Sequence, residues 1–224
     1  MFEYIMNVFP FLLMIFFSLM IRINDRLKQT EKEKTMATLS YLKAQINPHF
    51  LFNTLNSIYS LAIEKSDYTA TAIVKLSGMM RYVISETNSD FVSLDKEITY
   101  ITDYIDLQKV RLGNTINLSF SIKGSYAGKQ IAPFILIPFV ENAFKHGVNP
   151  EENSSIVISI EIKENEIILI VNNNKVNINK SKEIESGLGI RNTRNRLQLL
   201  YPANHSLIIN DDNKEFKVYL QISI

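Results

Sequence analysis

The chain has 224 residues, of which 46% are hydrophobic and 21% charged, and it contains no cysteine. This length and apolar content suffice for one or two globular domains with a real core, and they exclude a disordered chain. The missing cysteines exclude a disulfide scaffold, a thiolate metal site and a cysteine nucleophile. The net charge of +1 provides no broad basic surface, so we expect no direct contact with nucleic acid.

Residues 4–21 form an apolar run, YIMNVFPFLLMIFFSLMI, that predicts a single transmembrane helix in contact with membrane lipid. An uncleaved anchor fits better than a cleaved signal peptide, because no basic region precedes the run and no small-x-small site follows it. Residues 22–50 carry six Lys or Arg and three acids, so the positive-inside rule places the rest of the chain in the cytoplasm. The expected location is the cytoplasmic membrane, crossed once.

Helical patterns fill the sequence from the anchor to residue 113. Residues 24–46 lack Gly and Pro and favour a helix that ends at Asn47-Pro48, because proline removes a hydrogen-bond donor. A second helix is expected around residues 50–61, a third over 68–85 and a fourth over about 93–110, each with an apolar stripe. The first half of the region after the anchor is therefore predicted to be helical.

After Gly113 the apolar period changes from about 3.6 to 2, which indicates half-buried strands. About five strands are expected, with hairpin turns at residues 164–165 and 211–213, and helices are expected over 134–146 and 190–201. The polar stretch 172–186 is typical of a long mobile loop. Strands covered by helices on one face predict an α+β sandwich with a domain boundary near Gly113.

The first candidate for chemistry is His49, in the segment LKAQINPHFLFNTLNSI. On a helix His49 shares a face with Gln45 and Asn53, and an imidazole held in one tautomer by amide side chains can act as a nucleophile. Spacing alone favours the alternative, a capping or core histidine at a proline kink.

The second candidate is PFVENAFKHG, residues 138–147. Asn142 offers an oxygen ligand for Mg²⁺, Lys145 and His146 can reach phosphate oxygens, and Glu141 can polarise a water or an imidazole. An ordinary helix end, capped by Gly147, explains the last three residues and leaves Glu141 and Asn142 unexplained.

The third candidate is SGLGIRN, residues 186–192, where two glycines enter a helix. Glycines allow a ligand to approach the backbone, and amides at a helix N-terminus attract phosphate. A plain loop-to-helix entry accounts for this motif equally well.

Together and in this order, the three motifs are far more specific than any one of them. The chain resembles the LytS-type sensor histidine kinases, in which a dimerising helical domain containing NPHFLFN precedes a Bergerat-fold ATP-binding domain. The resemblance covers about residues 38–222 and is carried by QINPHFLFNTLNSI, VSLDKEITYITDYIDLQKVRLG, IAPFILIPFVENAFKHGV and GLGIRNTRNRLQLLYP. Together with the apolar run and the change of period after Gly113, it predicts three parts: an anchor in residues 1–22, a helical stalk, dimerisation and phosphoacceptor domain in 23–112, and an ATP-binding catalytic domain in 113–224.

The resemblance also implies a role for each matching residue. His49 matches the phosphoacceptor, Glu141 matches the acid that assists phosphotransfer, and Asn142 matches the Mg²⁺ ligand of the family's N box. The remaining positions near the nucleotide phosphates are Lys145 and His146 of the N box and Gly187 and Gly189 of the glycine box.

One segment departs from the family pattern. Many relatives carry Asp-x-Gly-x-Gly, whose Asp reads the adenine amino group, and this chain has VNNNKV at residues 171–176. Asn173 stands at the position of the Asp, and Lys175 replaces the first glycine. Asn173 still offers a carbonyl acceptor, but it lacks the charge that strengthens such a hydrogen bond, so weaker nucleotide binding is expected.

The implied function is that of a homodimeric, membrane-anchored histidine kinase. It transfers phosphoryl from Mg·ATP to His49 and then to an aspartate of a response regulator, implied to be of the LytTR type. The alternatives are a pseudokinase that binds nucleotide weakly, a helical adaptor in which His49 is structural, and a nucleotide-hydrolysing ATPase. Intact N and glycine boxes disfavour the adaptor, and the NPHF segment disfavours the ATPase.

Overall fold

The structure is a computed structural model that describes residues 13–30, 48–86, 89–149, 154–176 and 187–224. The chain divides into two compact units, Met1–Pro48 and His49–Ile224. In the first unit, residues 13–30 form an α-helix with exposed side chains. Among the residues that the structure describes, no helix has the length and apolar character needed to cross a membrane. Residues 4–12 of the predicted span and 31–46 of the predicted stalk helix lie outside the described residues.

The second unit begins with the helical hairpin, formed by α2 (Pro48–Ile63) and α3 (Tyr68–Glu86). Both helices were expected from their apolar stripes. The hairpin packs against α4 (Leu94–Leu112), which buries a long apolar face that includes Ile98, Ile101 and Ile105. A single 3₁₀ turn, η1 (Gly113–Thr115), leads from α4 into the sheet.

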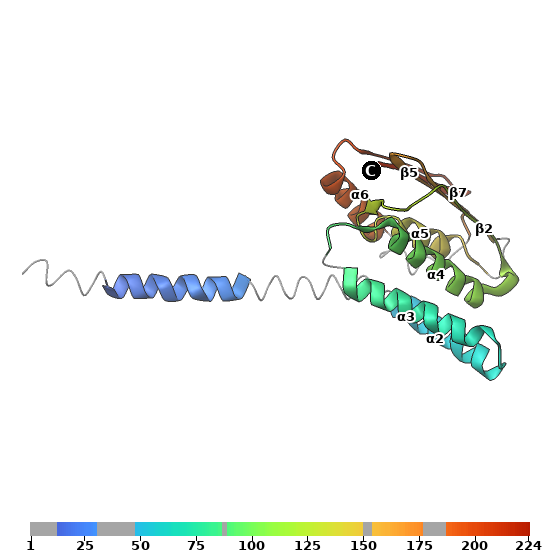
Figure 1. Ribbon diagram of the computed structural model, residues 1–224, viewed down its shortest axis with the longest axis horizontal. Helices are drawn as coiled ribbons and strands as arrows, with labels where there is room; N and C mark the ends of the chain where they lie inside the picture. Colours follow the sequence, from blue (N-terminus) through green and yellow to red (C-terminus); the bar gives the residue numbers. More distant parts are fainter. Residues whose placement is uncertain (1–12, 31–47, 87–88, 150–153, 177–186) are drawn as a thin grey trace, which may run out of the picture. The chain divides into compact units, whose positions relative to one another are not determined.

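Five strands form one mixed sheet in the order β2-β4-β5-β7-β6, seen at the upper right of Figure 1. The strands are β2 (Ile116–Lys123), β4 (Ser154–Ile162), β5 (Glu166–Asn174), β6 (His205–Asp211) and β7 (Glu215–Ser223). β2 and β4 are parallel, and every other neighbouring pair is antiparallel. A second, two-stranded sheet pairs β1 (Val92–Ser93) with β3 (Gln130–Ile131), which the sequence did not predict.

Helices α5 (Ile137–His146) and α6 (Gly187–Leu200) pack on the sheet. α5 contacts β4 and β5, and α6 contacts β6 as well as α5. Alternate residues of β4, Ile156, Ile158 and Ile160, are fully buried, as the period-2 pattern predicted. The predicted α+β architecture is confirmed, with its core between the sheet and these helices.

The predicted boundary near Gly113 is not visible as a break in packing, because His49–Ile224 form one compact unit. α4 joins the two sides of that position. It contacts α3 before the boundary and β3 after it. The division into residues 23–112 and 113–224 stays a prediction.

The loop predicted for residues 172–186 is wrong at its start, because β5 continues to Asn174. Asn172 and Asn173 pair with β4 on one side and with β7 on the other. A central strand satisfies its backbone groups on both edges, and that outweighs the low strand propensity of asparagine. Residues 177–186 of the predicted loop lie outside the described residues.

Both remaining helix starts differ from the predictions. α6 begins at Gly187, before the predicted residue 190. α5 begins at Ile137, after the predicted residue 134. Phe134 has a φ of 56°, in the left-handed region, and therefore cannot belong to a right-handed helix.

Candidate functional site

His49 lies in the first turn of α2, and its side chain is exposed to solvent. The amide nitrogen of Asn53, one turn later, lies 3.1 Å from Nε2 and 3.4 Å from Nδ1 of the imidazole. Because an amide nitrogen only donates, the ring nitrogen that it bonds is the unprotonated one. The predicted pairing of His49 with Asn53 is confirmed, and the exposed ring rules out a core histidine. Gln45 lies outside the described residues.

The N-box helix, α5, carries four of the predicted site residues. Glu141 and Asn142 are half-buried, while Lys145 in the next turn is exposed. Within the described part of the chain the Asn142 amide has no hydrogen-bond partner, so its oxygen is available to a ligand. Lys145 and His146 occupy the last turn, where the helix dipole favours positive charge.

Glu141 is the most strongly perturbed group of this helix. Burial raises its pKa from 4.5 to about 7, and the positive charge of Lys145 opposes that rise. Two tyrosines of α4, Tyr100 and Tyr104, also have raised pKa values. Burial is the larger cause for both, and the negative charge of Glu141 is the second. Glu141 can therefore exchange a proton near neutral pH, as a general base must.

The end of β5 lies directly against the end of the N-box helix. A Cβ atom built on Gly147 would lie 2.7 Å from Cβ and 3.0 Å from Nδ2 of Asn173, so only glycine allows this approach. Asn173 is 1% exposed, and its Nδ2 donates to the carbonyl of Asn174 at 3.1 Å. Its Oδ1 is buried with no hydrogen-bond partner. A buried acceptor without a donor fits an external N–H group, such as an adenine amino group.

The residue that replaces the family glycine makes contacts of its own. Lys175 Nζ forms an ion pair with Asp211 at 2.5 Å, and Lys175 N donates to the carbonyl of Lys214 at 2.7 Å. Lys175 therefore ties the end of β5 to the β6–β7 hairpin.

The two glycines of the third motif lie in the first turn of α6. A Cβ atom on Gly189 would meet nothing within 4 Å, and Gly189 is exposed. Its carbonyl accepts a hydrogen bond from Thr193 Oγ1 at 3.0 Å. Packing among the described residues therefore does not require a glycine at position 189. If a glycine is needed there, the need comes from something other than these residues.

An aromatic chain links the histidine-bearing helix to the N-box helix. Phe50, the neighbour of His49, packs on Tyr104 of α4 with ring centroids 4.7 Å apart. Tyr104 in turn contacts Phe144 of α5 edge to face at 5.7 Å. No hydrogen bond or ion pair within the described residues joins His49 itself to Asn142 or Asn173. The structure thus connects the first two motifs through apolar contacts.

Several residues of this region were not identified from the sequence. Glu97 is fully buried in α4, and Tyr82 Oη donates to its Oε2 at 2.6 Å. Tyr104 and Gly147 were likewise missed as packing residues. A detectable signal existed for Glu97, because it falls on the apolar stripe of Leu94, Ile98 and Ile101 and interrupts it with a carboxylate.

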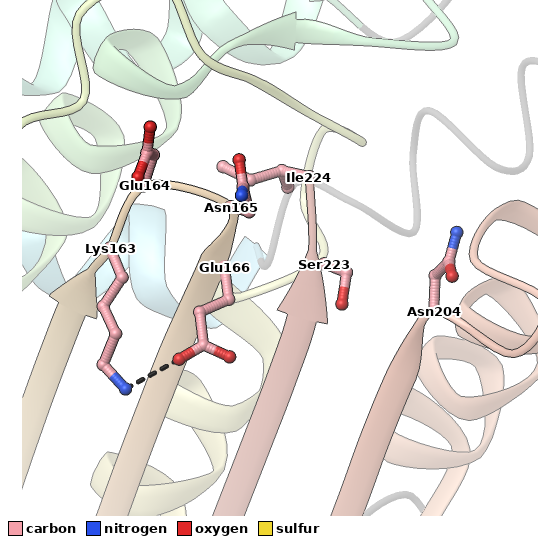
Figure 2. A pocket seen from close by; sticks show the side chains of 7 residues that line it. All are labelled: Lys163, Glu164, Asn165, Glu166, Asn204, Ser223 and Ile224. Carbon is pink, nitrogen blue, oxygen red and sulfur yellow. Dashed lines mark hydrogen bonds and ion pairs between the residues drawn. The ribbon is translucent and has the colours of Figure 1, made fainter.

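A shallow cavity of about 460 Å³ lies far from these residues, at the β4–β5 turn. Figure 2 shows its lining, in which Lys163 pairs with Glu166 at 2.6 Å. Glu166 begins β5, whereas Asn173 is near its end, and seven residues at about 3.3 Å each separate them by roughly 23 Å. The cavity does not belong to the predicted site.

Comparison with known proteins identifies the relationship. A family model described as Histidine kinase matches residues 37–116. The chain is 29% identical over 194 residues to the sensor protein LytS of Staphylococcus saprophyticus, which covers 81% of this chain and 33% of that protein. The chain is related to the LytS-type sensor histidine kinases. The resemblance predicted from the sequence is confirmed.

A second LytS-type relative, the sensor histidine kinase/phosphatase LytS of Staphylococcus aureus, is 29% identical over 205 residues. The match covers 85% of this chain and 35% of that protein. The chain therefore spans about a third of the length of the curated relatives that it matches.

Solved histidine kinase structures show a weaker likeness. The catalytic domain of histidine kinase ThkA aligns with 59% of this chain and 93% of its own, at 16% identity and a TM-score of 0.42. Histidine kinase ThkA in complex with response regulator protein TrrA aligns with 85% and 63%, at 13% identity and a TM-score of 0.41. Both TM-scores are low, so the relationship rests on the sequence matches.

Proposed function

We propose that the chain is an ATP-dependent protein-histidine kinase that phosphorylates its own His49. The observation that carries this proposal is the position of His49. Its imidazole is exposed, while the adjacent Phe50 is packed through Tyr104 onto Phe144 of the N-box helix. This arrangement leaves the nucleophile accessible and links its helix, through Tyr104 of α4, to the helix that carries the candidate nucleotide residues.

The residues of the site divide the work of phosphoryl transfer. A lone pair on the His49 ring forms a bond to the γ-phosphorus while the bond to the bridging oxygen breaks and ADP leaves. The Asn53 amide donates a hydrogen bond to the lone pair of one His49 ring nitrogen. If that nitrogen is the one that attacks, this hydrogen bond must break first. Glu141, with its pKa near 7, takes up the ring proton.

The nucleotide is bound by groups from three elements. Asn173 Oδ1 accepts from the adenine amino group, and Lys145 and His146 contact phosphate oxygens. Gly187 and Gly189 at the start of α6 present backbone N–H groups to the phosphates. Asn142 would supply an oxygen ligand to Mg²⁺, and the bound ion would neutralise charge on the phosphates.

An exposed apolar face of the hairpin supports the proposal of a homodimer. Four large apolar side chains at spacings of three and four residues are exposed on α2, namely Phe52, Leu55, Tyr59 and Ile63. Such a stripe on a helix is typical of a seam that is covered by another helix. We assign it to the same stripe of a second copy, in a four-helix bundle.

We also propose that the phosphoryl group passes from His49 to an aspartate of a cytoplasmic response regulator, of the LytTR type. The relationship to sensor histidine kinases supports a regulator as partner. The apolar run of residues 4–21 supports anchoring in the cytoplasmic membrane, and the charge of residues 22–50 supports a cytoplasmic site.

The test is autophosphorylation of the full chain with labelled Mg·ATP, comparing it with His49→Gln and Asn142→Ala. Acid-labile, base-stable label that disappears in both variants is the expected result. A folded chain that takes up no label contradicts the proposal. Nucleotide binding then separates the remaining possibilities, because an adaptor binds none.

A second candidate function is a pseudokinase that binds nucleotide without transfer. It is favoured by Asn173 and by Lys175, whose ion pair with Asp211 occupies the end of β5. Nucleotide binding without label on His49 would establish this alternative. Restoring the acid with Asn173→Asp would then be expected to tighten nucleotide binding.

A further inference from the structure

Glu97 is a fully buried carboxylate that no step of the proposed reaction uses. Its exposed fraction is 0%, and it accepts three hydrogen bonds. The donors are Tyr82 Oη at 2.6 Å, the N–H of Phe134 at 3.0 Å and the N–H of Leu136 at 3.3 Å. These donors come from parts of the chain that are far apart in sequence, so Glu97 joins them.

Two of the donors belong to the entry turn, which we define as residues 132–136, immediately before the N-box helix. Phe134 in this turn has a φ of 56°. A non-glycine residue in the left-handed region is strained and persists only where its surroundings hold it. The two hydrogen bonds to Glu97 provide that restraint, and they fix the point at which α5 begins.

The entry turn is also held from the side of α6. Arg196 Nη2 donates to the carbonyl of Pro133 at 2.8 Å, and the N–H of Ala132 donates to Tyr201 Oη at 2.8 Å. Helix α6 carries the two glycines of the third motif in its first turn. The turn is therefore the junction between the N-box helix and the glycine-box helix.

The third donor comes from the hairpin. Tyr82 lies on α3, and its ring packs on Tyr100 and on Phe134, with centroids 5.0 Å apart in both cases. Phe134 also meets Tyr100 edge to face at 5.7 Å. The Tyr82 hydroxyl is thus the polar contact that connects the hairpin to Glu97 and, through Glu97, to the entry turn.

We propose that Glu97 is a positioning residue that couples the histidine-bearing hairpin to the N-box helix. When the hairpin moves, the Tyr82 hydroxyl moves with α3. Its hydrogen bond then alters the position of the Glu97 carboxylate, which restrains Phe134 and Leu136. The nucleotide residues of α5 then respond to the position of the helical hairpin that carries His49. This inference rests on the proposed kinase function for its catalytic consequence, and on the contacts alone for the coupling.

The experiment compares the full chain with Tyr82→Phe and Glu97→Gln. Tyr82→Phe removes one hydroxyl that touches neither backbone amide. Glu97→Gln keeps the shape of the side chain but replaces one acceptor oxygen by an NH2 group, so at least one of the three hydrogen bonds is lost. Tyr219→Phe is the matched control, because its hydroxyl also donates to a side chain, Gln221 at 3.1 Å, but lies on the sheet. Hydrogen exchange of segment 132–138 and the kcat and KM for His49 phosphorylation are measured for each chain.

A typical hydrogen bond within a protein contributes about 1 kcal/mol, and up to about a tenfold change in an equilibrium constant. We therefore expect Tyr82→Phe to raise exchange at the amides of Phe134 and Leu136 about tenfold. We expect kcat to fall about tenfold, with the KM for ATP changed less than about twofold. We expect Tyr219→Phe to leave the amide exchange, kcat and KM unchanged. We expect Glu97→Gln to change each of these quantities more than Tyr82→Phe does.

Equal exchange in Tyr82→Phe and in the control overturns the coupling, whether or not the chain is active. Raised exchange with an unchanged kcat in an active chain overturns the positioning role. If the unmodified chain takes up no label but Tyr82→Phe still raises the exchange, the coupling is supported and the proposed kinase function is contradicted. If Glu97→Gln does not fold, Tyr82→Phe decides the question alone.

Discussion

Substituting Gly147 by alanine tests the contact between the N-box helix and β5. The added Cβ would lie 2.6 Å from the carbonyl oxygen of Ala143 and 2.7 Å from Cβ of Asn173. Contacts of this kind ordinarily begin at 3.4 Å, so Asn173 of β5 must move by about 0.7 Å and the Ala143 carbonyl of α5 by about 0.8 Å. Neither neighbour is the free end of a flexible side chain, and the backbone at Gly147, with φ −101°, would itself accept alanine. The whole effect is therefore steric.

Overpacking of this size costs about 1–3 kcal/mol. For a unit the size of His49–Ile224 we expect Tm to fall by about 2–12 °C. Because the displaced residue is Asn173, whose Oδ1 is the candidate adenine acceptor, we expect nucleotide affinity to fall about tenfold. Thermal unfolding and titration with a fluorescent nucleotide measure the two effects separately.

Gly78→Ala is the matched control. A Cβ atom there would be 3.8 Å from Asp103 Oδ2, an ordinary contact, and the position lies within α3. Alanine in a helix interior is favoured over glycine, so a gain of about 0.5–1 kcal/mol is expected. If Gly147→Ala matches the unmodified chain in both Tm and nucleotide affinity, the close approach of α5 to β5 is wrong.

Three further predictions follow from charge and exposure. The pKa of Glu141, about 7 in the folded chain and 4.5 as its ordinary value, means that the folded state loses up to about 3 kcal/mol of stability as pH rises from about 4.5 to 7. Glu141→Gln removes that loss in unfolding measurements at pH 5 and 8, and it abolishes the rise in phosphorylation rate through pH 7. Lys75 pairs with Asp103 at 2.7 Å and Asp106 at 3.0 Å, so Lys75→Met should destabilise the chain by about 1–3 kcal/mol, measured by urea unfolding. Leu55→Asp should convert dimer to monomer in sedimentation experiments, and an unchanged mass contradicts the assigned seam.

Much of the fold could be predicted from local sequence patterns. The change of apolar period at Gly113 separated helices from strands, and the alternation in β4 and β7 matched the buried faces found in the structure. Predictions failed where partners distant in sequence decide the conformation. Asn172 and Asn173 are strand because β4 and β7 pair with them on both sides, and α5 starts late because Glu97 binds the backbone before it.

The sequence by itself determined the family relationship and the identity of the candidate residues, because His49, Asn142 and Gly187 lie in motifs that are contiguous along the chain. Only the tertiary structure decided which residues meet. The contact of Gly147 with Asn173 and that of Tyr82 with Glu97 each join separate elements. Such contacts depend on packing distances of a few tenths of an ångström, and neither composition nor periodicity carries that information.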